Sequence, residues 1–168
     1  MIATSLQKKL CMLGGFSVGK TSLIRRYVSS VFSDSYLTTV GVKIDKKTVD
    51  LDGRTVNLIL WDLAGEDDLS SLRTSYLRGA SGYLLVADGT RRSTLDVALS
   101  IQQRVETEFG PLPFALLLNK NDLKDQWTIA DADVANLSLN GWWVRSSSAR
   151  TGEGVEEAFR DLAIRVTG

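Results

Sequence analysis

The chain has 168 residues, of which 43% are hydrophobic and 24% charged, and its 20 basic residues balance its 20 acidic ones. This length predicts one domain over residues 1–168, since domains commonly span about 100–200 residues. The zero net charge disfavours a nucleic-acid partner, which requires a strongly basic face, but it is compatible with a local anion pocket. One cysteine and no histidine exclude an intrachain disulfide and Ser-His-Asp catalysis, and they favour a cytoplasmic location.

Strand and helix patterns alternate along the chain. The strands at 40–51 and 55–62 are joined by Asp52-Gly53, a hairpin turn signal, and Ser93 or Thr94 is the expected N-cap of a long helix. Strands are expected at 6–13, 40–51, 55–62, 82–88, 114–119 and 141–145, and helices at 20–29, 93–109, 130–139 and 152–166.

This order predicts an α/β fold with a mostly parallel six-stranded sheet, one antiparallel edge hairpin and helices on both faces. Ligands of such sheets bind at the carboxyl ends of the strands. The residues that follow each strand are therefore the expected positions of a ligand site.

The first strand is followed by GGFSVGKT, which fits the phosphate-binding pattern G-x-x-x-x-G-K-[ST] between a strand and a helix. Amides of a glycine-permitted turn and the N-terminus of the next helix form an anion nest. Lys20 adds a charge for the β- and γ-phosphates, and the Thr21 hydroxyl is a hard oxygen ligand for Mg²⁺. The pattern predicts a P-loop NTPase three-layer fold. The expected phosphate contacts are Gly15, Phe16, Ser17, Val18, Gly19, Lys20, Thr21 and Ser22.

The fifth expected strand ends in Asn119-Lys120-Asn121-Asp122, which predicts how a base is selected. Asp122 can accept hydrogen bonds from two adjacent N–H groups, which the edge of guanine offers and that of adenine does not. Asn119 can bridge to the purine and brace the phosphate loop, and the Lys120 stem can cover the ring. A third base-contacting turn is expected at Ser148, Ala149 and Arg150, after the sixth strand.

Together these motifs resemble those of the small GTPases of the Ras superfamily, nearest the Rab-type branch. WDLAGE at 61–66 is similar to the family's WDTAGQ, SYLRGA at 75–80 to SYYRGA, and TGEGVEEAF at 151–159 to TGENVEEAF. The resemblance covers essentially the whole chain. It implies a molecular switch that binds GTP and GDP with Mg²⁺ and slowly hydrolyses GTP to GDP and phosphate.

The resemblance also implies roles for residues in two switch segments. Thr39 matches the threonine that ligates Mg²⁺ when the γ-phosphate is present, although the adjacent Thr38 can be confused with it. Asp62 matches the aspartate that holds Mg²⁺ through a water, and Gly65 the amide that senses the γ-phosphate. Two aromatic residues match those beside the guanine and over the phosphates, Phe32 and Tyr36, respectively; taken alone, each is as easily a packing residue.

Catalysis is assigned to Lys20, Gly65 and Glu66, but two residues depart from the family pattern. Glu66 replaces the water-positioning glutamine and cannot donate a hydrogen bond to a phosphate oxygen when ionised. Phe16 stands where much of the family has a small residue. The alternative is therefore a GTP-binding interaction module with little or no hydrolysis. A phosphoryl-transfer kinase on the same loop is disfavoured by the guanine signature and by the lack of an arginine-rich lid.

Smaller departures are Leu63 for threonine and Arg150 for lysine. Four arginines near the expected site are either arginine fingers in cis or, as we favour, solvated or partner-facing charges: Arg73, Arg78, Arg91 and Arg92. Alternation along the last strand places one ring of the Trp142–Trp143 pair in the core and the other outward.

The resemblance implies partners of three kinds: effectors, exchange factors and GTPase-activating proteins, all acting through the switch segments. The chain ends at Gly168 without a cysteine for prenylation, so the C-terminus present does not support membrane attachment. It fits either a trimmed chain or a tail-less form such as a bacterial relative.

Overall fold

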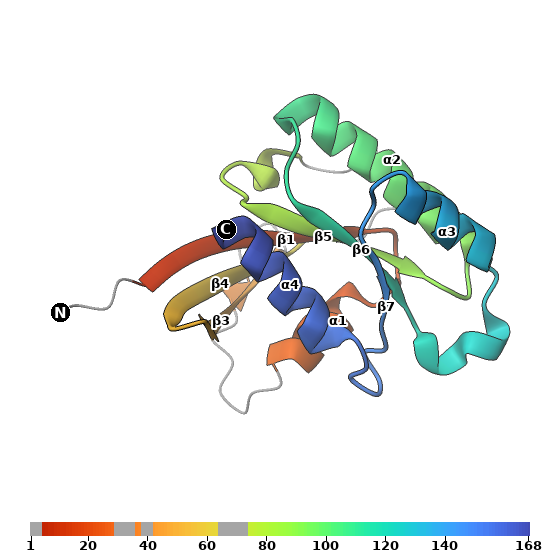
Figure 1. Cartoon of the computed structure of the whole chain (residues 1–168), viewed down its shortest axis with the longest axis horizontal. Coiled ribbons are helices and arrows are strands. Elements are labelled where there is room, and N and C mark those ends of the chain that lie inside the picture. Colours follow the sequence, from red (N-terminus) through yellow and green to blue (C-terminus); the bar gives the residue numbers. More distant parts are fainter. Residues whose placement is uncertain (1–4, 29–35, 38–41, 64–73) are drawn as a thin grey trace.

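The computed structural model describes residues 5–28, 36–37, 42–63 and 74–168. In these ranges the chain forms one sheet with the strand order β2-β3-β4-β1-β5-β6-β7 (Figure 1). The strands are β1 (Ser5–Gly14), β2 (Tyr36–Leu37), β3 (Lys43–Leu51), β4 (Arg54–Asp62), β5 (Gly82–Asp88), β6 (Phe114–Asn119) and β7 (Val144–Ser146).

The strand pairing confirms the predicted fold class. The strands β4, β1, β5, β6 and β7 run parallel, and β3 pairs antiparallel with β4 through a turn in which Asp52 and Gly53 have positive φ. The two-residue strand β2 extends the β3 edge and is too short to leave a sequence pattern. The last strand begins at Val144 rather than at 141, because Gly141 has positive φ and the Trp142 amide donates to the Leu137 carbonyl at the end of the preceding helix.

Four α-helices and two 3₁₀ helices connect the described strands. Helix α2 begins one residue earlier than expected, and its N-cap is Arg91 rather than Ser93 or Thr94. The Thr94 hydroxyl instead donates to the Arg91 carbonyl and accepts from the Asp88 amide at 2.8 Å. The helices are α1 (Lys20–Val28), α2 (Arg92–Phe109), α3 (Asp131–Leu139), α4 (Val155–Thr167), η2 (Thr74–Leu77) and η3 (Asn121–Gln126).

Helix α4 begins at Val155, three residues later than expected, because two glycines precede it with positive φ. Gly152 has φ 90° and Gly154 has φ 74°. A Cβ at Gly154 would lie 2.3 Å from the Ser146 carbonyl oxygen, so only glycine fits this approach of the chain to β7.

Two hydrophobic clusters cover the two faces of the sheet. Alternating residues of β1 divide between them: Leu10 and Met12 join the cluster with α1 and α4, whereas Cys11 and Leu13 join the cluster with α2. In Figure 1, α2 lies above the central strands and α1 below them. This three-layer arrangement fixes the strand ends, and with them the loops that follow.

The tryptophan pair also divides between the two faces. Trp142 packs against the α2 cluster, where it meets Phe114 edge-on, and Trp143 packs against the α1–α4 cluster. Both side chains are partly buried, so the expectation of one core ring and one outward ring is wrong. Arg165 of α4 covers the Trp143 ring at 4.2 Å from its centroid, which explains why this ring is not fully exposed.

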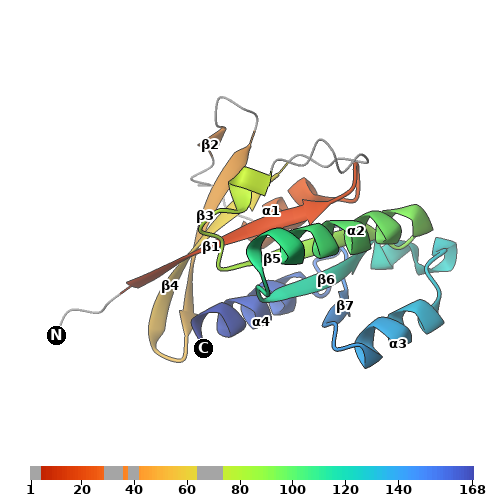
Figure 2. The ribbon, with the colours of Figure 1, turned by 90° about the horizontal axis from the view of Figure 1, so that it is seen from above.

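The carboxyl ends of the parallel strands lie at one edge of the sheet, where Asp62, Asp88 and Asn119 end β4, β5 and β6. Figure 2 shows the C-terminal end of α4 near the β3–β4 hairpin, away from these loops, and Arg54 at the start of β4 bonds to the Thr167 carbonyl. Within the described ranges, no helix is long and apolar enough to cross a membrane.

Candidate functional site

The phosphate loop, residues 14–21, leaves β1 and enters α1. Ser17 has φ 58° and Gly19 has φ 102°, so the loop contains the left-handed conformations that turn successive amides inward. A Cβ at Gly14 would lie 2.5 Å from the Val86 carbonyl oxygen, and one at Gly19 would lie 2.3 Å from the Asn119 side-chain nitrogen. Lys20 is buried at the first position of α1. The loop therefore has the geometry of an anion cradle.

Asn119 joins the phosphate loop to the two expected base-contacting segments. Its side-chain nitrogen donates to the Val18 carbonyl at 3.0 Å, and its side-chain oxygen accepts from the Ala149 amide at 3.2 Å and from the Ser147 hydroxyl at 3.4 Å. Only 2% of Asn119 is exposed. A buried amide with these partners fixes the three segments relative to one another.

The first base loop, residues 119–122, and the second base loop, residues 147–150, meet at Asp122. The Ser148 hydroxyl donates to Asp122 Oδ1 at 2.7 Å, which orients the carboxylate. These loops border a cavity of about 460 Å³. It is lined by Gly19, Ser22, Asn119, Lys120, Asp122, Leu123, Ala149 and Arg150, of which sequence reasoning missed only Leu123.

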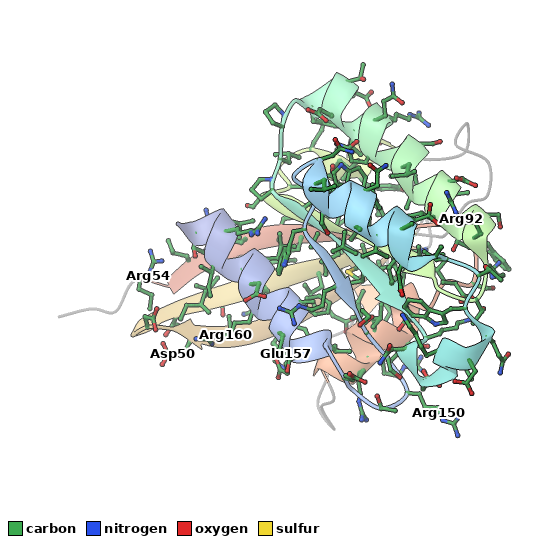
Figure 3. The ribbon with its side chains drawn as sticks, turned by 45° about the vertical axis from the view of Figure 1, so that its right-hand side comes forward. Asp50, Arg54, Arg92, Arg150, Glu157 and Arg160 are labelled. Carbon is green, nitrogen blue, oxygen red and sulfur yellow. The ribbon has the colours of Figure 1, made fainter. Side chains whose placement is uncertain are left out.

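The side chain of Arg150 lies at the exposed rim of this cavity (Figure 3). Ser148 is buried beneath it. Directly after the second base loop, Arg26 of α1 donates to the Thr151 carbonyl at 2.7 Å and ties this part of the chain to α1.

Thr21 and Asp62 come together as expected for a cation site. The Thr21 hydroxyl donates to Asp62 Oδ2, so the two side-chain oxygen atoms lie next to each other at the end of the phosphate loop. Both are hard oxygen ligands of the kind that Mg²⁺ prefers, and they fit this ion. Among the described residues no group of three or more His, Cys, Asp or Glu side chains gathers, so such an ion would need ligand or water oxygens as well.

Asp88, at the end of β5, is a site residue that sequence reasoning missed. Its side chain is 1% exposed, and Oδ2 lies 2.7 Å from Lys120 Nζ and 3.1 Å from Arg91 Nε. Thr90 donates to Oδ1 through its amide and its hydroxyl. Burial by itself would raise the pKa of Asp88, but the hydrogen bonds from Lys120, Thr90 and Arg91 outweigh it and lower the pKa to about 2. The sequence signal that could have identified Asp88 is its position at the end of a predicted strand, at the edge of the sheet where ligands bind.

Trp127 braces the first base loop from outside. Its indole nitrogen donates to the Lys120 carbonyl at 2.9 Å, and its ring occupies the space where a Cβ on Gly89 would lie. Lys120 itself has φ 73°. The tryptophan therefore supports a left-handed residue whose side chain reaches Asp88.

Several expected site residues lie outside the described residues: Phe32, Thr38, Thr39, Gly65, Glu66 and Arg73. Tyr36 begins β2, and its side chain is likewise not described. Arg91 and Arg92 are not simply solvated charges, because Arg91 pairs with Asp88, and Arg92 pairs with Asp96 and Asp133. Leu63, which replaces a threonine of the family pattern, is buried in the α2 cluster.

A phosphate loop after β1 and a carboxylate-bearing base loop after β6, joined by one buried asparagine, define an α/β nucleotide-binding protein of the P-loop class. The sequence model of the Ras family matches residues 9–167.

Three relatives show the same similarity. The chain is 33% identical over 157 residues to GTP-binding protein ypt2 of Schizosaccharomyces pombe, covering 92% of this chain and 78% of the relative. It is 33% identical over 161 residues to GTP-binding protein YPT1 of Saccharomyces cerevisiae, covering 94% and 78%. With Ras-related protein Rab-4 of Dictyostelium discoideum it shares 34% over 153 residues, covering 90% and 75%. The chain therefore belongs to the Ras family, on its Rab-type branch.

Proposed function

We propose that this chain is a guanine-nucleotide-dependent switch that binds GTP and GDP with Mg²⁺ and slowly hydrolyses GTP. As a member of the Ras family the chain is a small GTPase. The observation that carries the proposal is the bonding of Asn119 to Val18 and Ala149, because it holds the phosphate cradle next to the two loops that border the base pocket.

Guanine selection follows from Asp122. Its carboxylate borders the cavity and is oriented by Ser148, so it can accept from the two adjacent N–H groups of guanine. Adenine presents no such pair of donors. The Lys120 ammonium is bound to Asp88, which leaves the aliphatic stem to pack on a base.

Thr21 and Asp62 are the described residues that would hold Mg²⁺, Asp62 through a water, and Thr39 is the expected third contact. When bound, the ion supplies charge neutralisation for the phosphates. Lys20 supplies the fixed protein charge at the same cradle. Glu66 and the Gly65 amide are the proposed water-positioning and γ-phosphate-sensing groups. Effectors, exchange factors and activating proteins are the proposed partners at the switch segments, and a cytoplasmic location stays a prediction.

Nucleotide competition tests the proposal. A fluorescent GDP (N-methylanthraniloyl-GDP) should bind in the presence of Mg²⁺ and be displaced by GDP and GTP but not by ADP, and EDTA should accelerate its release. Asp122→Asn should weaken GDP binding at least tenfold and favour xanthosine diphosphate, because an amide donates where the carboxylate accepted. Asp125→Asn, an exposed carboxylate in the same 3₁₀ helix η3, is the control. Displacement by ADP, or unchanged GDP affinity in Asp122→Asn, contradicts the base assignment.

Phosphate release during a single turnover separates the GTPase from the non-hydrolysing module. Release of phosphate above the buffer rate supports the GTPase. Tight GTP binding with no release supports the module.

A further inference from the structure

Arg91 connects two parts of the site that are distant in the sequence. It lies between β5 and α2, where it is the N-cap residue of α2. Its Nε atom lies 3.1 Å from Asp88 Oδ2, and its Nη2 atom donates to the Phe16 carbonyl of the phosphate loop at 2.7 Å. The planar guanidinium makes both contacts at once, which a lysine ammonium cannot do with the same geometry.

The other partner of Asp88 is in the first base loop. Lys120 Nζ lies 2.7 Å from the same Oδ2 atom that Arg91 contacts, and Thr90 occupies Oδ1. The buried Asp88 carboxylate therefore joins the Phe16 end of the phosphate loop, through Arg91, to Lys120. This connection is separate from the one made by Asn119, which reaches Val18.

The bond to Phe16 orients more than one carbonyl group. The Phe16 carbonyl and the Ser17 amide belong to the same planar trans peptide, so their C=O and N–H bonds point in opposite directions. Ser17 has a left-handed φ of 58°, which costs free energy for a non-glycine residue unless its surroundings hold it. By fixing the Phe16 carbonyl, Arg91 fixes the direction of the Ser17 N–H group.

We propose that Arg91 is a positioning residue that, held by Asp88, presets the Ser17 amide for the β-phosphate and so slows the release of a guanine nucleoside diphosphate. This role rests on the proposed function. In this role Arg91 acts through the backbone of the phosphate loop and does not contact the reacting phosphate. Without the guanidinium, the nucleotide itself must order the phosphate loop when it binds, and this cost lowers its affinity.

The test is the release rate of N-methylanthraniloyl-GDP from the whole chain. Arg91→Gln should release it about tenfold faster, the scale expected when one hydrogen bond from a charged donor is lost. Arg92→Gln is the matched control. Arg92 is the neighbouring residue and is similarly exposed, at 39% against 40% for Arg91, but its partners are Asp96 and Asp133 instead of Asp88. Figure 3 shows Arg92 at the start of α2. Equal rates in the two variants overturn the proposal.

Three further measurements separate positioning from a general loss of structure. Arg91→Gln should lower the affinity for GDP much more than that for GMP, because GMP lacks the β-phosphate; a variant that is merely destabilised loses both equally. In Asp88→Asn, adding Arg91→Gln should accelerate release by less than twofold, because Arg91 without the Asp88 carboxylate is no longer held against the Phe16 carbonyl. Arg91→Lys should recover only part of the slow release.

The outcomes also distinguish this inference from the proposed function. If the unsubstituted chain binds no guanine nucleotide, the proposed function and this inference both fail. If it binds GDP tightly but Arg91→Gln loses GDP and GMP affinity in equal proportion, only the role of Arg91 fails.

Discussion

The Asn119 side-chain nitrogen lies 3.0 Å from the Val18 carbonyl oxygen, although 101 residues separate the two in the sequence. A Cβ on Gly19 would collide with that nitrogen, so the glycine of the phosphate loop and the asparagine of the base loop require each other. The relationship joins the two halves of the nucleotide site within the protein itself.

Asn119→Ala should weaken both folding and nucleotide binding, because it leaves the Val18 carbonyl and the Ala149 amide without their buried partner. The expected loss is about 1–3 kcal/mol in the free energy of unfolding, and GDP should dissociate at least tenfold faster. Urea unfolding and stopped-flow release of fluorescent GDP measure the two effects. Asn121→Ala, which breaks only an exposed bond to Glu153, should change neither by a comparable amount. Matching values for the two variants would refute the linking role of Asn119.

Thr21→Asn should shift the preference of the site towards GDP, because it replaces the hydroxyl beside the Asp62 carboxylate that is the proposed Mg²⁺ ligand. The triphosphate depends more on Mg²⁺, so its affinity should fall by at least tenfold relative to that of GDP. Calorimetric titration with each nucleotide measures the ratio. Thr48→Asn, on the exposed face of β3, serves as the control. An unchanged ratio would count against Thr21 as a metal ligand.

Glu66→Gln should accelerate GTP hydrolysis, by about tenfold or more, because a neutral amide both accepts from water and donates to a phosphate oxygen. Single-turnover phosphate release measures the rate. Phe16→Gly should add to the increase if the ring, 61% exposed on the phosphate loop, crowds the attacking water. Identical rates for Glu66→Gln and the unsubstituted chain would mean that residue 66 does not position the water.

The buried Asp88 carboxylate should make folding sensitive to acid. Its pKa of about 2 in the folded chain lies below the value of about 3.8 for a free side chain, so its contribution is fully present above about pH 4. That contribution, about 2 kcal/mol in all, is lost as the pH falls from about 4 towards 2. In urea unfolding, Asp88→Asn should therefore narrow the stability difference between pH 6 and pH 3 by about 1 kcal/mol. The control is Asp96→Asn, an exposed carboxylate, which should leave the stability difference between pH 6 and pH 3 unchanged. If Asp88→Asn also left this difference unchanged, the prediction that Asp88 is held ionised in the folded chain would be wrong.

Periodicity and turn residues predicted the sheet because its elements are long or bounded by clear signals. The apolar run of β6 and the Asp52-Gly53 turn are examples. The start of β7 was misplaced because Trp142 and Trp143 have strand-like preferences, whereas the bond from the Trp142 amide to Leu137 keeps the first of them in a turn. This hydrogen bond forms only in the folded chain, so the pattern of residue types in the sequence does not reveal it.

The phosphate and base motifs could be located in the sequence because each is short and contiguous, and the structure brings them together. The Asp88–Arg91 pair was not, because its meaning depends on Lys120 and Phe16, which other strand ends bring to it. Arg91 alone looks like one of many exposed cations. Its role becomes visible only from the distances to Asp88 and to the loop carbonyl.

Arg91 holds position 16 by its backbone, and this has a consequence for how the protein can change over evolutionary time. Every amino acid has the carbonyl that Arg91 contacts, so the anchor is indifferent to the side chain carried there. That side chain is exposed on the phosphate loop. Substitutions at position 16 can therefore change the rate of GTP hydrolysis while the backbone contact that supports nucleotide affinity stays the same.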